Sequence, residues 1–143
     1  MSARWRPGDR ERLKRRFDRL PGLTKQYVFD ALQLGADEIV AMQKRLAPVD
    51  DGDLQDAIHW EVARRSSEIR ALRIRAGNGR VRYAHLVEFG VAPHRVGGRF
   101  KGAMHPGTQA QPFFFPAYRA LKKRVRARIR RAFKKAVLAS KNV

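Results

Sequence analysis

Apolar residues recur every three or four positions between residues 24 and 46, which is the repeat of one face of a helix. Thr24 suits the start of this helix as a capping residue. Pro48 predicts its end, because a residue that precedes proline is disfavoured in the helical region. We expect the apolar stripe to be a core face; its members are Val28, Leu32, Gly35, Ile39, Met42 and Leu46.

A second long helix is predicted after Pro116, over residues 117–140. Proline suits the first helical position because its φ is already helical and it needs no N–H there. The apolar residues stand at intervals of four, so their stripe wraps slowly around a helix of about 3.6 residues per turn. A wrapped stripe suits contact with a curved surface or with more than one partner. Its members are Leu121, Val125, Ile129, Phe133 and Val137.

Between these helices the hydrophobic period falls to two, which is the pattern of half-buried strands. Residues 58–63 and 72–76 alternate in this way, and Asn78-Gly79 predicts a hairpin turn into a third extended segment over residues 81–89. The chain is therefore expected to have an α+β fold, in which a small antiparallel sheet of three to four strands is packed by a long helix.

The 143 residues fit a single domain with basic helices at both ends. We expect a short basic N-terminal helix over residues 1–22, an α+β core over 23–116 and a long basic C-terminal helix over 117–143. A loop rich in glycine and proline occupies residues 90–112, and long loops of this kind are usually functional or disordered in isolation. We expect it to become ordered on assembly; a solvated loop without a function is the alternative.

Charge is concentrated at the two ends of the chain. The net charge is +19; residues 1–26 carry nine basic and three acidic residues, and residues 117–143 carry eleven basic residues and no acidic one. The segment between them carries twelve basic and ten acidic residues. Cationic ends of this kind attract polyanions without selecting a sequence. The basic residues expected to face DNA or a partner are Arg95, Arg99, Lys101, Lys122, Arg126, Arg130 and Lys134.

Candidate chemistry is sparse, and no catalytic residue, metal site or cofactor is expected. The chain has no cysteine, which excludes disulfides and thiolate metal sites, and no phosphate-binding loop motif occurs. His85, His94 and His105 lack the spacing of metal ligands. The acidic segment 50–56 is expected to supply a turn and a helix cap at Asp53 rather than the carboxylates of a nuclease. No apolar stretch has the length of a membrane span or a signal-peptide core, so synthesis and use in a cytoplasm are expected.

Glu88 and three consecutive phenylalanines are the most unusual residues of the central segment. Glu88 lies in the apolar stretch HLVEFG, where a carboxylate is costly unless paired; an arginine of the loop, the first helix or a neighbouring subunit could pair it. The phenylalanines could stack on bases, but an apolar plug buried in the sheet or in a neighbour is favoured. The candidate anchor and interface residues are Phe113, Phe114, Phe115, Leu121, Val125, Ile129 and Phe133.

The order of three motifs, LAPVDDGDLQDAI, YAHLVEFG and QPFFFPAYRA, resembles the neck or tail-completion proteins of long-tailed bacteriophages. Similar proteins occur in prophage remnants and in phage-like gene transfer agents. The resemblance spans residues 24–140 and departs from the usual pattern at Asp51, where threonine is common, and at Val91. The residues that carry it are Pro48, Gly52, Leu54, Tyr83, Ala84, Glu88, Phe89, Gly90, Pro112 and Pro116.

The resemblance implies a structural protein of the head–tail junction, without enzymatic activity. Proteins of this kind form rings, commonly of six subunits, that complete or terminate the tail and join the tail tube to the head connector or stopper. Double-stranded DNA passes through such a ring and is held without sequence preference. The implied location is the virion, after assembly in the host bacterial cytoplasm, with no membrane partner. The alternative is a non-specific nucleic-acid-binding protein with two cationic arms; a nuclease is a third reading.

Overall fold

The computed structural model describes residues 8, 11, 15, 22–63 and 71–139. The expected N-terminal helix over residues 1–22 lies almost entirely outside the described residues. The chain divides into two compact units. The first comprises Met1–Gly35, Val62–Arg73 and Lys123–Val143, and the second comprises Ala36–Glu61 and Ile74–Lys122. Each unit is described by itself below.

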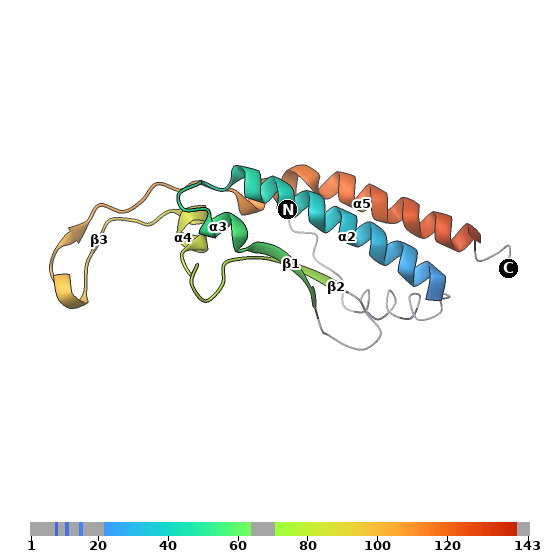
Figure 1. The fold of residues 1–143 in the computed structure, drawn as a ribbon, viewed down its shortest axis with the longest axis horizontal. Coiled ribbons are helices and arrows are strands. Elements are labelled where there is room, and N and C mark those ends of the chain that lie inside the picture. Colours follow the sequence, from blue (N-terminus) through green and yellow to red (C-terminus); the bar gives the residue numbers. More distant parts are fainter. Residues whose placement is uncertain (1–7, 9–10, 12–14, 16–21, 64–70, 140–143) are drawn as a thin grey trace. The chain divides into compact units, whose positions relative to one another are not determined.

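Two long helices account for most of the regular structure, as predicted (Figure 1). Helix α2 spans Gly22–Leu46 and ends before Pro48, as the sequence indicates. Its predicted stripe is buried or half-buried except at Leu46, which is exposed. Helix α5 spans Phe114–Ala139 and so begins three residues earlier than expected. Pro116 is therefore its third residue, where a missing N–H is still tolerated because the first turn of a helix has no intrahelical acceptor for it.

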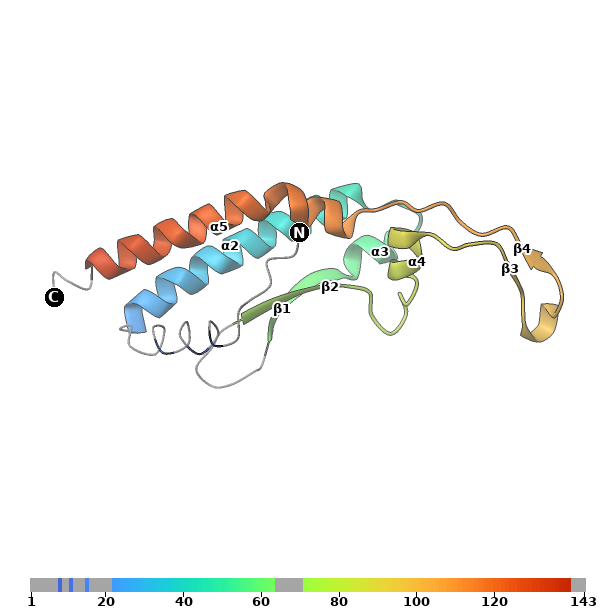
Figure 2. The same ribbon diagram turned by 180° about the vertical axis from the view of Figure 1, so that it is seen from behind.

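In the first unit, the N-terminal half of α2 lies beside the C-terminal half of α5 (Figures 1 and 2). The contact is close at Gly35, where an added Cβ would lie 2.5 Å from Val125 Cγ1. Val125 and Ala136 of α5 are buried on this side. The wrapped stripe of α5 is therefore used in part within the chain itself.

The core of the second unit contains one cluster of buried residues: Ala47, Leu54, Ala57, Ile58, Val81, Ala84 and Phe113. Two short helices contribute to it, α3 over Asp53–Asp56 and α4 over Ala84–Phe89. Phe113 is completely buried. The prediction that the phenylalanine motif begins with an apolar plug is confirmed for this residue, and the plug fills the unit's own core.

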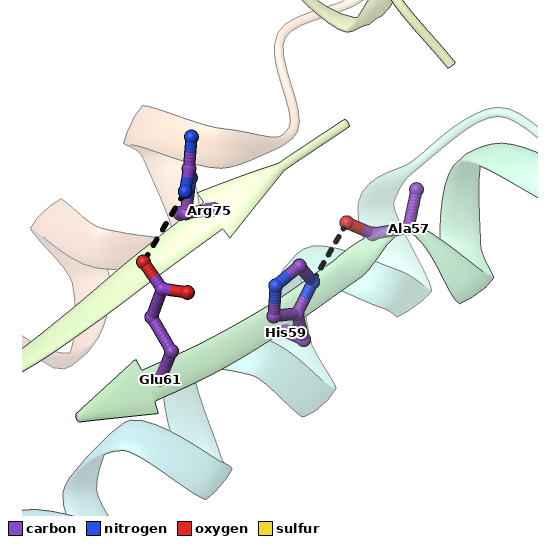
Figure 3. A network of polar contacts seen from close by, with 4 residues as sticks. All are labelled: Ala57, His59, Glu61 and Arg75. Carbon is purple, nitrogen blue, oxygen red and sulfur yellow. Dashed lines mark hydrogen bonds and ion pairs between the residues drawn. The ribbon is translucent and has the colours of Figure 1, made fainter. Parts of the chain in front are cut away.

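The α+β class is confirmed, with small antiparallel sheets of two strands each. The first sheet pairs β1, Ile58–Ala63, with β2, Ala71–Ala76. An ion pair joins the exposed faces of these strands, between Arg75 Nη1 and Glu61 Oε1 at 3.2 Å (Figure 3). On the same face His59 Nδ1 lies 3.2 Å from the carbonyl oxygen of Ala57 (Figure 3).

The predicted third strand over residues 81–89 is wrong, because most of this segment, Ala84–Phe89, forms α4. Its apolar residues fit a period of two, yet the side chains that become buried are Val81, Ala84 and Glu88, which have helical spacing. The predicted hairpin turn is absent for a related reason. The Asn78 side chain accepts hydrogen bonds from the backbone N–H groups of Arg80 and Val81, at 2.9 and 2.8 Å, and so closes a local turn that leads into α4.

The predicted loop over residues 90–112 folds back on itself as a second, very short sheet. Strand β3, His94–Arg95, pairs antiparallel with β4, Met104–His105, and the 3-10 turn η1, Gly98–Phe100, forms the tip. Closer to the core, Val91 and Thr108 exchange two backbone hydrogen bonds of 2.9 Å. We call residues 90–112 the hairpin arm. It extends away from α3 and α4 in both views (Figures 1 and 2).

Candidate functional site

Glu88 is buried, with 6% of its surface exposed, and it binds the first backbone groups of α5. Its Oε2 accepts hydrogen bonds from the N–H groups of Phe113 and Phe114 at 2.7 and 2.8 Å, and its Oε1 accepts one from Phe115 at 3.1 Å. These N–H groups have no acceptor within the helix, and a helix N-terminus carries a partial positive charge. The N-terminus of α5 is therefore the partner that the structure gives Glu88, in the electrostatic role that an arginine could have filled.

The three phenylalanines divide between core and surface. Phe113 is buried and Phe114 is half-buried, whereas Phe115 is 44% exposed. The Phe115 ring lies 6.0 Å from that of Phe89, which is 69% exposed. Because α4 carries Phe89 directly after Glu88, the carboxylate that fixes the start of α5 also holds this aromatic pair in place. Among the described residues the pair is therefore an exposed apolar surface.

Gln43 is a buried residue of this region that the sequence interpretation missed. Its side chain is fully buried, and its Nε2 donates a hydrogen bond of 3.1 Å to the carbonyl oxygen of Phe114. The available signal was its position, four residues after Ile39 on the apolar face of α2, where a polar residue needs a specific partner. Gln43 and Glu88 thus hold the first turn of α5 from two different helices.

A groove of about 630 Å³ lies in the second unit between α4 and the base of the hairpin arm. Two of the motif residues named in the sequence analysis, Pro48 and Tyr83, line it. Leu86, which is 41% exposed, contributes an apolar wall. Gly90 fixes the direction of the arm beside the groove: its φ is +71°, and an added Cβ would lie 2.8 Å from Thr108 O. The remaining lining residues are Val87, Val91, His94, His105, Thr108, Gln109 and Gln111.

The segment that follows Pro48 is acidic and exposed. Asp50, Asp51, Asp53 and Asp56 all have exposed side chains. Helix α3 begins at Asp53, and the residue before it, Gly52, has a φ of +87° and makes no side-chain cap. The prediction that Asp53 caps this turn is therefore wrong, and its carboxylate is on the surface. We call residues 50–56 the acidic segment.

The tip of the hairpin arm combines apolar and basic side chains. Phe100 is 71% exposed and Met104 is 63% exposed. The predicted basic residues Arg95, Arg99 and Lys101 surround them and are also exposed. Below the tip the rings of His94 and His105 stack at 5.1 Å. His105 Nδ1 accepts a hydrogen bond of 3.0 Å from the N–H of Gly107, so this nitrogen is already engaged.

The basic residues predicted on α5 lie mostly on its exposed side. Arg126, Arg130 and Lys134 are exposed and follow one another at intervals of four, which puts them on one face. Lys122 is half-buried, and its Nζ lies 5.6 Å from the centre of the Tyr118 ring. Of the predicted apolar residues of this helix, Val125 is buried, Leu121 and Ile129 are half-buried and Phe133 is exposed.

Within residues 22–63 and 71–139, the structure groups no three side chains of histidine, aspartate or glutamate that could hold a metal ion. None of the described helices has the length and apolar character that crossing a membrane requires.

Comparison with known families places part of this chain in one of them. The family described as "Bacteriophage HK97-gp10, putative tail-component" matches residues 11–90. That range contains the acidic segment, α4 and the motif residues from Pro48 to Gly90, whereas Pro112 and Pro116 lie beyond it. Searches among curated proteins and among solved structures found no significant match.

Proposed function

The chain belongs to the HK97-gp10-like family of phage tail components, and from this premise we propose that it is a ring-forming structural protein of the head–tail junction. As a tail component it is a virion protein that contacts other virion proteins. The proposed ring joins the tail tube to the head connector or stopper and surrounds the path of the DNA. Six copies are proposed, as in the neck and tail-completion proteins that the sequence resembles.

The observation that carries this proposal is the set of large apolar side chains left on the surface of the second unit. Phe89, Phe115, Phe100 and Met104 are exposed at two different places, the start of α5 and the tip of the hairpin arm. Contiguous exposed apolar surface in a soluble protein commonly marks an interface. Two unlike surfaces on one chain suit a heterologous contact, in which each copy offers one surface to the copy before it and the other to the copy after it. Such contacts form a ring when the rotation from copy to copy closes.

The basic face of α5 supports the proposed position around DNA. Arg126, Arg130 and Lys134 span about 12 Å along the helix at the standard rise per residue. Side chains of this kind bind phosphates without reading bases, as a protein through which a genome passes requires. The exposed basic residues of the hairpin arm, Arg95, Arg99 and Lys101, suit contact with a protein partner or with the same DNA.

The alternative function is non-specific nucleic-acid binding by a small species, which the net charge of +19 favours. The two functions differ in assembly. We expect nucleic-acid-free protein to form a ring that survives high salt, either alone or after tail-tube or connector protein is added; native mass spectrometry at low and high salt measures this. A species that remains small under all these conditions, and that binds any DNA until salt releases it, would establish the alternative.

A further inference from the structure

We propose that the tip of the hairpin arm of one copy inserts Phe100 into the groove between α4 and the arm base of the next copy. The inference specifies the contact within the proposed ring and rests on that ring. Nothing in the family match assigns a role to the arm, which lies beyond residue 90.

The first argument is the match between an uncovered apolar tip and an uncovered apolar groove. Phe100 and Met104 lie at the tip with most of their surfaces exposed. The groove, of about 630 Å³, offers Pro48, Leu86 and Val91 as apolar walls. This volume lies within the range of roughly 300–1,000 Å³ in which protein pockets enclose a ligand, so an aromatic side chain and its neighbours fit.

The second argument is charge complementarity. Phe100 stands directly between Arg99 and Lys101, both exposed. The acidic segment begins two residues after the groove residue Pro48, and its Asp50 and Asp51 are exposed. These carboxylates belong to the densest run of acidic residues in a chain of net charge +19. A basic tip that docks beside Pro48 therefore approaches a segment of opposite charge, and such complementarity favours one docking orientation.

The third argument identifies the occupant as a second copy. The groove is lined in part by the arm itself, through Val91, His94, His105 and Thr108. Strand pairing holds His94 opposite His105, and Val91 opposite Thr108, so the arm runs as one paired stem from the groove to its tip. A tip that is separated from the groove by this stem cannot fold back into it while the pairing persists. The tip and the groove are different surfaces of one chain, which is the requirement for a heterologous contact that closes into a ring.

The absence of cysteine makes this contact directly testable by disulfide cross-linking. Phe100→Cys and Leu86→Cys chains are prepared separately, mixed at equal concentration and oxidised. A disulfide needs Cα atoms about 4.4–6.8 Å apart, so only a close contact gives a product. We expect covalent heterodimers in this mixture and few in a mixture of Phe100→Cys with Leu34→Cys, an exposed apolar residue of α2. Circular dichroism of each single variant checks that the helices are retained.

Charge reversal provides a second, independent test on the same surfaces. The Arg99→Glu/Lys101→Glu chain and the Asp50→Lys/Asp51→Lys chain are each expected to lose self-assembly, whereas an equal mixture of the two, or one chain with all four changes, regains it. Arg126→Glu/Arg130→Glu on α5 is the matched control and is expected to retain assembly.

The outcomes separate this contact from the ring itself. A wild-type ring, with equal cross-linking in both mixtures and no effect of charge reversal, would overturn the contact and leave the ring in place. Cross-linking of Phe100→Cys to tail-tube protein, and not to Leu86→Cys, would assign the tip to another virion protein and also overturn it. A wild-type chain that never assembles and gives no cross-link would overturn both proposals.

Discussion

Glu88 acts as a cap for a helix that begins 26 residues later in the chain. A capping carboxylate usually lies next to the helix that it caps, but here it is delivered by α4 and accepts three hydrogen bonds at once. The three backbone N–H groups and the buried carboxylate satisfy each other's hydrogen-bonding requirements, which burial would otherwise leave unmet. The residue therefore ties α4 and α5 together within the second unit.

We expect Glu88→Ala to lower the free energy of unfolding by about 2–4 kcal/mol, because it leaves the N–H groups of Phe113, Phe114 and Phe115 without their acceptor. Glu88→Gln keeps one acceptor oxygen and should cost less. Urea unfolding measures the change. Glu61→Gln, which removes the charge of the exposed pair with Arg75, is the matched control and should cost roughly 0–1 kcal/mol. Equal losses for Glu88→Ala and Glu61→Gln would contradict the role of Glu88 as a cap.

The sequence predicted that Glu88 needs a partner, because a carboxylate in HLVEFG is costly. It did not predict which group this partner is, because no residue pattern identifies the backbone N–H groups at the start of a distant helix. Phe113 was predicted as a plug for the general reason that phenylalanine prefers interiors, and it is buried. The sequence could not predict whether its neighbours Phe114 and Phe115 are buried or exposed. The side of the helix on which each of them lies depends on where α5 begins.

At the scale of elements, the two long helices pack closely at Gly35. An added Cβ there would meet Val125 Cγ1 at 2.5 Å, a distance that real Cβ contacts do not reach. We expect Gly35→Ala to destabilise the protein by about 1–3 kcal/mol through overpacking, although alanine is the better helix former. Thermal unfolding monitored by circular dichroism at 222 nm would measure it.

Two variants decide whether the close contact causes this loss. Gly22→Ala changes a glycine of the same helix that has nothing within 4 Å of the added Cβ, so it should be neutral or slightly stabilising. Val125→Ala combined with Gly35→Ala should recover part of the loss that Gly35→Ala causes, since it removes the clashing methyl groups. A double variant that loses the sum of the two single effects would exclude overpacking as the cause.

The elements were predicted with unequal success for physical reasons. Long helices have a repeat that few other structures share, so α2 and α5 could be placed from spacing alone. Six residues of α4 are too few to distinguish a period of two from one of 3.6, and the third strand was predicted in their place. Strands β3 and β4 have only two residues each, and paired backbones of this length have no hydrophobic pattern to detect.

The hairpin arm is expected to be the least protected element of the free subunit. Its residues are largely exposed, and exposed backbone hydrogen bonds open more readily than buried ones. We expect amide hydrogen exchange over residues 90–111 to be fast in the free subunit and slow in the assembled ring, while exchange in α5 changes much less. Equal strong protection of the arm in the two states would contradict ordering on assembly.

At the scale of the whole molecule, α2 and α5 each begin in one compact unit and end in the other. Unfolding of either unit would therefore end both long helices in their middle. We expect a single cooperative transition, with equal calorimetric and van't Hoff enthalpies, as in a single domain. Two separated transitions in differential scanning calorimetry would show that the units are independent domains.

Charge is the property of the whole chain that the sequence predicts most directly. Whether this charge binds DNA depends on which face of the molecule carries it.

We expect Arg126→Ala/Arg130→Ala/Lys134→Ala to weaken DNA binding equally for all DNA sequences. The slope of log K against log salt concentration should fall by about three, because each residue neutralises about one phosphate. Arg45→Ala/Arg80→Ala/Arg82→Ala removes the same charge from exposed positions outside α5 and should change the slope much less. Equal changes would mean that net charge, rather than the face of α5, attracts the DNA. Fluorescence anisotropy with labelled duplexes over a range of salt concentrations distinguishes these outcomes. The assembled mass should be the same for both variants, since neither removes a residue of the hairpin tip or of the groove.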